Sequence, residues 1–177
     1  MRPNRIVCVG NRFVAGDDFG PRVHSRLTQR PLPDGVEVID GGIAGLNLLR
    51  HLEGAGRVVL VDTLDGRAGP GEVAVLTPSQ VSVEPPNGSA RWAPLSSEHS
   101  HGLQWMLRAL PEVCEGDPPE VLLVCAEAGS DEDTVAKASE LALELVIAGS
   151  EAASIHDVPE RGAGTGGRSG PEREGRG

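Results

Sequence analysis

Short, mostly apolar runs recur along the first third of the chain, and each is followed by acidic residues. The runs cover residues 6–9, 36–39 and 58–61. The carboxylates that follow them are Asp17, Asp18, Asp40 and Asp62. Runs of this length that end at turn-forming residues are typical of buried β-strands. If the strands lie parallel in one sheet, the acids meet at its carboxyl edge, where open α/β sheets bind ligands.

Strand and helix patterns alternate over the rest of the chain. Strands are expected at residues 5–9, 36–39, 57–62, 72–76 and 120–126, and helices at 20–30, 44–53, 101–110 and 132–148. This alternation predicts an α/β fold, a three-layer αβα sandwich in which helices flank both faces of a mostly parallel, twisted sheet. Prolines and a glycine between residues 77 and 94 predict an exposed loop.

The length and the composition predict one folded domain and a tail. A chain of 177 residues fits a single hydrophobic core. From about Ser150 the composition changes to Gly, Pro, Glu and Arg, without a periodic apolar pattern. We therefore expect one α/β domain over residues 1–149 and a disordered tail over residues 150–177.

The charge and the cysteines narrow the possible partners and the compartment. A formal net charge of −10 argues against binding to nucleic acid and favours a protein or a cation as partner. No apolar run approaches the ~20 residues of a membrane span, and a secretion signal is not visible. The three cysteines form no CxxC pair and are expected to be reduced and buried. These features predict a cytoplasmic protein.

The turn over residues 10–20 lies where a dinucleotide-binding fold would carry its glycines. It lacks the GxGxxG spacing, and the carboxylates of Asp17 and Asp18 would repel a pyrophosphate, so nucleotide binding is disfavoured. One of these two acids could instead cap the helix that begins near Phe19, with its side chain accepting free backbone N–H groups. The other acid would then be available for a site.

Two further segments combine glycine or histidine with a predicted element boundary. Residues 40–46 read DGGIAGL, and the paired glycines permit positive φ and close backbone approach. A structural tight turn and a substrate groove explain this segment equally well. Residues 96–101 read SSEHSH and precede an amphipathic helix that carries Leu103 and Met106. A single histidine in such a place is more often structural or exposed than catalytic.

Four motifs in a fixed order together resemble one protein family. They are the segment from Gly10-Asn11 through Asp17 to Gly20, the turn Asp40-Gly41-Gly42-Ile43-Ala44-Gly45, the strand that ends at Asp62, and Ser97-Glu98-His99. In this order and spacing the chain resembles the [NiFe]-hydrogenase maturation proteases from Ile6 to about Ala148. These endopeptidases trim the C-terminal extension of a hydrogenase large-subunit precursor once nickel has been inserted.

The resemblance implies a metal-sensing catalytic site made of Asp17, Asp62 and His99. Two carboxylates and an imidazole suit a borderline divalent ion that keeps open coordination positions. The nickel is expected to be carried by the precursor, and another divalent cation could bind the isolated protein. Such a metal could polarise the scissile carbonyl or lower the pKa of a water molecule. The resemblance also implies that Asp40, Gly41 and Gly42 lie along the substrate path.

Departures from the family pattern mark the chain as a divergent member. Gly16 stands where the first acid of the doublet is usual, so a one-residue shift would make Asp18 the ligand in place of Asp17. Ile43 replaces the usual threonine of the glycine-rich turn. HExxH, GxSxG and a cysteine beside a histidine are not found. The alternative function is a non-catalytic or reassigned relative that binds a metal or a hydrogenase precursor without cutting it.

Overall fold

The structure is a computed structural model, and it describes residues 2–43, 45–81, 96–114 and 116–149. The predicted tail over residues 150–177 lies outside these residues, as does most of the predicted loop over residues 77–94. The described part contains no helix that is both long enough and apolar enough to cross a membrane.

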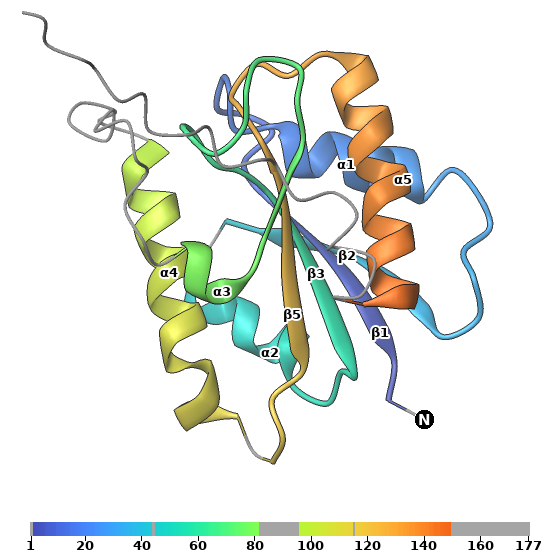
Figure 1. Cartoon of the computed structure of the whole chain (residues 1–177), viewed down its shortest axis with the longest axis vertical. Coiled ribbons are helices and arrows are strands. Elements are labelled where there is room, and N and C mark those ends of the chain that lie inside the picture. The colour runs from blue at the N-terminus through green and yellow to red at the C-terminus, as the bar shows by residue number, and fades with distance from the viewer. Residues whose placement is uncertain (1, 44, 82–95, 115, 150–177) are drawn as a thin grey trace, which may run out of the picture.

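Five strands form one twisted sheet at the centre of the molecule (Figure 1). Their bounds are β1 Asn4–Val9, β2 Val36–Gly42, β3 Arg57–Thr63, β4 Ala74–Leu76 and β5 Glu120–Ala126. The order across the sheet is β2-β1-β3-β5-β4, and the first four of these strands are parallel to their neighbours. Only β4 is antiparallel, paired with β5. The predicted α/β sandwich with a mostly parallel sheet is therefore confirmed.

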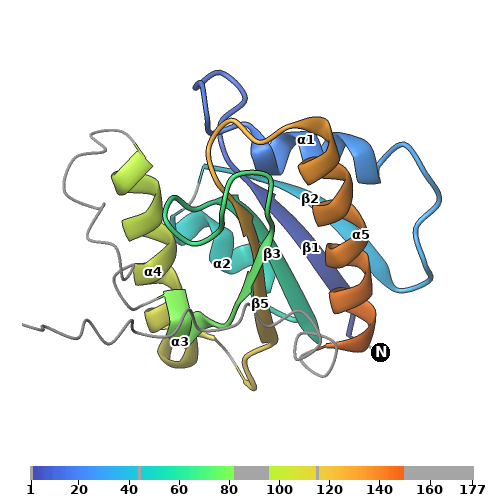
Figure 2. The same cartoon turned by 45° about the horizontal axis from the view of Figure 1, so that its top comes forward.

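Helices cover both faces of this sheet (Figure 2). On one face lie α1 Phe19–Leu27 and α5 Glu132–Ala148. On the other face lie the 3-10 turn η1 Leu46–Leu48 and the helices α2 Leu49–Leu52, α3 Pro78–Val81 and α4 Ser96–Val113. Each face therefore packs a separate hydrophobic cluster against the sheet.

The central strands read as nearly continuous apolar runs because both of their faces are buried. In β3, Val59 and Val61 pack with α1 and α5, whereas Val58 and Leu60 pack with the α2–α4 side. Alternation along the strand places Asp62 on the same face as Leu60. The apolar pattern thus decides which helix layer lies over this acid.

Several helix boundaries differ from the sequence prediction. The helix predicted over residues 20–30 ends at Leu27, and the one over residues 44–53 is reduced to η1 and the single turn α2. The helix predicted over residues 101–110 begins at Ser96 and continues to Val113. Its first turn is polar, so apolar spacing did not reveal it. Pro111 lies inside the last turns, where it removes one backbone donor without ending the helix. The predicted loop after residue 77 begins with α3.

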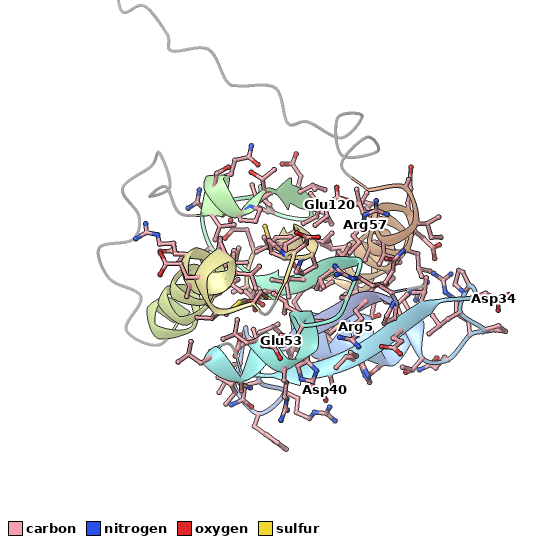
Figure 3. The ribbon with its side chains drawn as sticks, turned by 90° about the horizontal axis from the view of Figure 1, so that it is seen from below. Arg5, Asp34, Asp40, Glu53, Arg57 and Glu120 are labelled. Atoms are coloured by element: carbon pink, nitrogen blue, oxygen red, sulfur yellow. The ribbon has the colours of Figure 1, made fainter. Side chains whose placement is uncertain are left out.

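Arg57 ties the start of β3 to β5 and to the end of α5. Its Nε donates to Glu120 Oε2 at 2.7 Å, and its Nη1 donates to the carbonyls of Val146 and Ile147 at 3.1 and 2.8 Å. Figure 3 shows Arg57 and Glu120 side by side. The guanidinium thereby satisfies carbonyls at the C-terminal end of a helix, where positive charge is favourable.

We expect Arg57→Ala to lower the free energy of unfolding by about 2 kcal/mol, because it removes a charged hydrogen bond to Glu120 and the side-chain donor to the Ile147 carbonyl, while the Val146 carbonyl keeps its bond from Asn4 Nδ2. Urea denaturation measures this loss. Arg30→Ala is the matched control, because Arg30 pairs with Glu140 on the surface and such a pair contributes about 0–1 kcal/mol. Equal losses in the two variants would contradict the role assigned to Arg57.

Candidate active site at the carboxyl edge of the sheet

Asp62 is a buried acid with an incomplete set of hydrogen bonds. Its exposed fraction is 2%, and it follows the four apolar residues of β3. Oδ1 accepts a hydrogen bond from the adjacent Thr63 N at 2.8 Å. Oδ2 is buried and has no hydrogen-bond partner among the described residues. Because buried polar atoms are almost always paired, such an atom marks a candidate ligand position.

The surroundings of Asp62 disfavour its charged form. Burial is the main cause that raises its pKa to about 8, and the negative charge of Asp17 raises it further. The hydrogen bond from Thr63 N acts in the opposite direction but is the weaker influence. Strongly shifted carboxylates that are desolvated and lie beside another acid are characteristic of functional sites.

Asp17 is held in place by the turn that follows β1. Asn11 N donates both to the Asp17 carbonyl at 2.8 Å and to Asp17 Oδ2 at 2.9 Å. Asp17 N in turn donates to the Val14 carbonyl at 3.1 Å. The backbone therefore fixes the position of this carboxylate, whose charge acts on Asp62 from the neighbouring strand end.

Gly20 explains how the two acids come together. A Cβ atom at this position would collide with the backbone nitrogen and oxygen of Val9 and with the carbonyl of Val61. The first turn of α1 therefore lies directly against the ends of β1 and β3, at a distance that only glycine permits. As a result, Asp17, just before α1, lies at the same sheet edge as Asp62.

Asp18 occupies the N-cap position of α1, but its side chain makes no capping hydrogen bond. The predicted helix start near Phe19 is confirmed, whereas Asp18 contributes only its backbone carbonyl, which accepts from Arg22 N at 3.0 Å. Its φ of −100° and ψ of 2° differ from the extended conformation usual at an N-cap, which accounts for the missing side-chain bond.

Asp40 lies near the end of β2 and joins this strand to the turn that follows β1. Its Oδ1 accepts from Gly42 N at 3.1 Å, and its Oδ2 pairs with Arg12 Nη2 at 3.0 Å. Gly10 N also donates to the Gly42 carbonyl at 2.9 Å. Figure 3 labels Asp40, which belongs to the edge strand β2. Because β1 lies between β2 and β3, Asp40 and Asp62 belong to different parts of the edge.

Gly41, the residue of β2 after Asp40, has a packing role. An added Cβ would lie 2.8 Å from Val7 Cγ1 and 3.1 Å from Leu48 Cδ2, so this glycine lets β2 and η1 pack closely against β1. Asp40, Gly41 and Gly42 are the last residues of β2, where the register against β1 shifts between Cys8 and Val9, so the DGG motif is an irregular strand end and not the tight turn considered from the sequence. A role of Asp40, Gly41 and Gly42 in substrate binding remains a prediction.

The backbone of His99 lies near the start of α4, inside the helix rather than before it as predicted. Its side chain lies outside the described part of the structure. The N-terminal end of α4 is at the end of the sheet where β3 and β5 finish (Figure 1), and α4 covers the face to which Asp62 belongs. Among the described side chains, no group of three His, Cys, Asp or Glu residues could hold a metal ion.

Two acids that the sequence prediction missed tie the neighbouring loops together. Glu127, just after β5, accepts a hydrogen bond from Gly66 N at 2.7 Å, and Asp65 Oδ1 accepts from Ala128 N at 3.3 Å. These reciprocal bonds hold the segments after β3 and β5 beside Asp62. The rule that identified Asp17, an acid soon after a buried strand, would have found Glu127 as well.

The fold and its edge thus define an α/β protein in which two adjacent carboxylates are set at the switch point of a mostly parallel sheet. The family model described as hydrogenase maturation protease matches residues 21–153. The chain therefore belongs to the hydrogenase maturation protease family. The matched region begins after Asp17 and Asp18, so the match does not decide which of these two acids takes the ligand position.

Individual relatives agree with this assignment. The chain is 32% identical to the hydrogenase expression/formation protein HupM of Azotobacter chroococcum over 74% of its own length and 60% of HupM. It is 30% identical to the hydrogenase 2 maturation protease of Escherichia coli over 87% and 94% of the two chains. The structure of the E. coli endopeptidase HybD matches with a TM-score of 0.60 and 29% identity, over 86% of this chain and 93% of HybD.

In the metal-free protein, we expect Asp62→Asn to be more stable than the wild type at pH 8, and the difference to shrink toward pH 5. The pKa of the Asp62 carboxyl is about 8 in the folded protein, compared with its ordinary value of 3.8. Between these pH values the folded state binds more protons than the unfolded state, so the stability of the wild type falls as the pH rises. Each pH unit between 3.8 and 8 costs the wild type about 1.4 kcal/mol, so the gain at pH 8 is on the order of 5 kcal/mol.

Urea denaturation in the presence of a chelator at pH 5, 6.5 and 8 measures this effect. Asp34→Asn is the matched control, because Asp34 is exposed and precedes the start of β2, at the end of the sheet opposite to the two acids. Parallel pH profiles for wild type and Asp62→Asn would contradict the burial of an ionisable carboxyl at this position.

Proposed function

We propose that the protein is an endopeptidase that removes the C-terminal extension of a [NiFe]-hydrogenase large-subunit precursor after nickel insertion. The observation that carries this proposal is the buried Asp62, whose Oδ2 lacks a partner among the described residues and whose neighbour is a second carboxylate, Asp17. A buried carboxylate beside a second acid is costly alone and becomes favourable beside a cation. Membership of the maturation protease family supports the same reaction.

Asp17, Asp62 and His99 would contact the nickel that the precursor brings. The nickel is part of the substrate, and a set of two carboxylates and one imidazole leaves positions for the ligands that hold it in the precursor. The buried position of Asp62 makes the site selective, because a precursor without the cation offers nothing to offset the cost of ionising Asp62 beside Asp17. Nickel next to the scissile bond would supply Lewis-acid chemistry, acting on the carbonyl or on a water molecule.

The loops around the acids would position them for this contact. The turn hydrogen bonds from Asn11 N hold Asp17, and the Asp65 and Glu127 bonds hold the segments that flank Asp62. Asp40, Gly41 and Gly42 would line the approach of the extension on the β2 side. A divalent cation other than nickel would bind the isolated protein weakly, because the precursor supplies the remaining ligands.

The direct test is incubation of the purified protein with a nickel-loaded precursor, followed by the mass of the large subunit. We expect loss of the C-terminal extension with the wild type, and no loss with Asp62→Ala or His99→Ala or with a nickel-free precursor. Asp34→Ala is the control for the removal of an exposed acid. No shortening of the cognate precursor, under conditions in which a related maturation protease cuts its own, would favour the non-catalytic binding module.

A second test separates the two possible registers of the first turn. We expect Asp17→Asn to slow processing by about 100-fold or more, because it removes the carboxylate that acts on Asp62. Asp18→Asn changes the net charge equally and is expected to remain within a few-fold of the wild type. Initial rates of precursor cleavage measure both variants, and the reverse order would identify Asp18 as the ligand.

A further inference from the structure

Large apolar side chains are exposed at the same sheet edge as the two acids. The exposed large hydrophobic residues in the described part of the chain are Phe13, Val14, Ile43, Leu46, Val113 and Ile147. The first four lie in the turns that follow β1 and β2, and we call this set the apolar rim. The other two lie at the C-terminal ends of α4 and α5, at the opposite end of the sheet (Figure 1).

Phe13 is the most informative member of the apolar rim. The chain has only two Phe, two Trp and no Tyr, and its other phenylalanine, Phe19, is buried in the core. Phe13 is 91% exposed, yet its turn is well defined, because its backbone nitrogen donates to Asn11 Oδ1 at 3.0 Å. An aromatic side chain held outward by an ordered turn gains free energy only when another molecule covers it.

Two contacts hold the segments that follow β1 and β2 together. The ion pair between Arg12 and Asp40 joins them, and so does the hydrogen bond from Gly10 N to the Gly42 carbonyl. The first turn also contains Asp17. A molecule bound at Phe13 or Val14 is therefore held by the same turn that positions one acid of the candidate active site. The apolar rim and that site therefore share the turn that follows β1.

The charge around the apolar rim indicates what kind of molecule covers it. Residues 10–18 and 40–46 contain three carboxylates and one guanidinium, a formal net charge of −2, and the whole chain carries −10. Apolar side chains surrounded by excess negative charge fit a partner that has bulky apolar residues flanked by Lys or Arg.

We propose that the apolar rim docks a segment of the large-subunit precursor that carries bulky apolar side chains beside basic residues. This inference rests on the proposed function and deepens it, because it assigns substrate affinity to residues outside the Asp17–Asp62 pair. Binding on the rim orients the precursor so that its nickel reaches the acids. Phe13 and Leu46 are docking residues and take no part in bond cleavage.

Steady-state cleavage of the nickel-loaded precursor tests the proposal. Phe13→Ser and Leu46→Ser are each expected to raise KM about tenfold and to leave kcat unchanged, because they remove binding that is equal in the ground and transition states. Ile147→Ser is the matched control: Ile147 is 55% exposed and Leu46 is 58% exposed, but Ile147 lies at the opposite end of the sheet. Unfolding in urea checks that each variant retains its fold.

The affinity of Asp62→Asn for the same precursor, measured calorimetrically with and without Phe13→Ser, separates this inference from the proposed function. A tenfold loss of affinity without any cleavage by the wild type supports the docking surface and overturns the protease. Cleavage by the wild type with unchanged KM in both rim variants overturns the docking surface alone. Absence of both binding and cleavage overturns both. Sedimentation equilibrium that shows a dimer dissociated by Phe13→Ser, with unchanged KM, would assign the rim to a second copy of the chain.

Discussion

The site depends on the direct backbone contact between Gly20 and the ends of β1 and β3. Because no side chain separates α1 from Val9 and Val61, the turn before the helix is brought onto the sheet edge. That contact sets Asp17 near Asp62, and the turn it anchors also carries Arg12 and Phe13. The catalytic proposal and the docking surface therefore share one origin, the close packing of a helix N-terminus on two parallel strands.

Much of the fold could be predicted from the sequence because its dominant signals are local. Four-residue apolar runs identified the parallel strands, and helical spacing identified α5. The polar first turn of α4 and the short η1 and α2 elements could not be predicted, because they depend on packing against the sheet. The antiparallel direction of β4 could not be predicted either. It depends on pairing with β5, a later strand that lies between β3 and β4 in the sheet.

The candidate site was predictable in its residue types but not in its grouping. An acid after each strand pointed to Asp17, Asp40 and Asp62 alike. The order of the strands and the alternation of side chains separate them, because β1 stands between Asp40 and Asp62. The burial of Asp62, the lack of a partner for its Oδ2 within the described part of the chain, and the closeness of Asp17 are tertiary properties that no spacing in the sequence contains. The role of His99 rests on its sequence motif and on the helix to which it belongs.

The unpartnered oxygen of Asp62 has a consequence for the lifetime of the protein. The penalty for burying this carboxylate falls on the unliganded chain and is relieved when a cation arrives, so ligand binding and folding are linked. A precursor that carries its metal would then stabilise the protein that processes it, and the release of the mature product would return that protein to its less stable form. Under such linkage the cellular amount of the folded protein would follow the supply of its substrate.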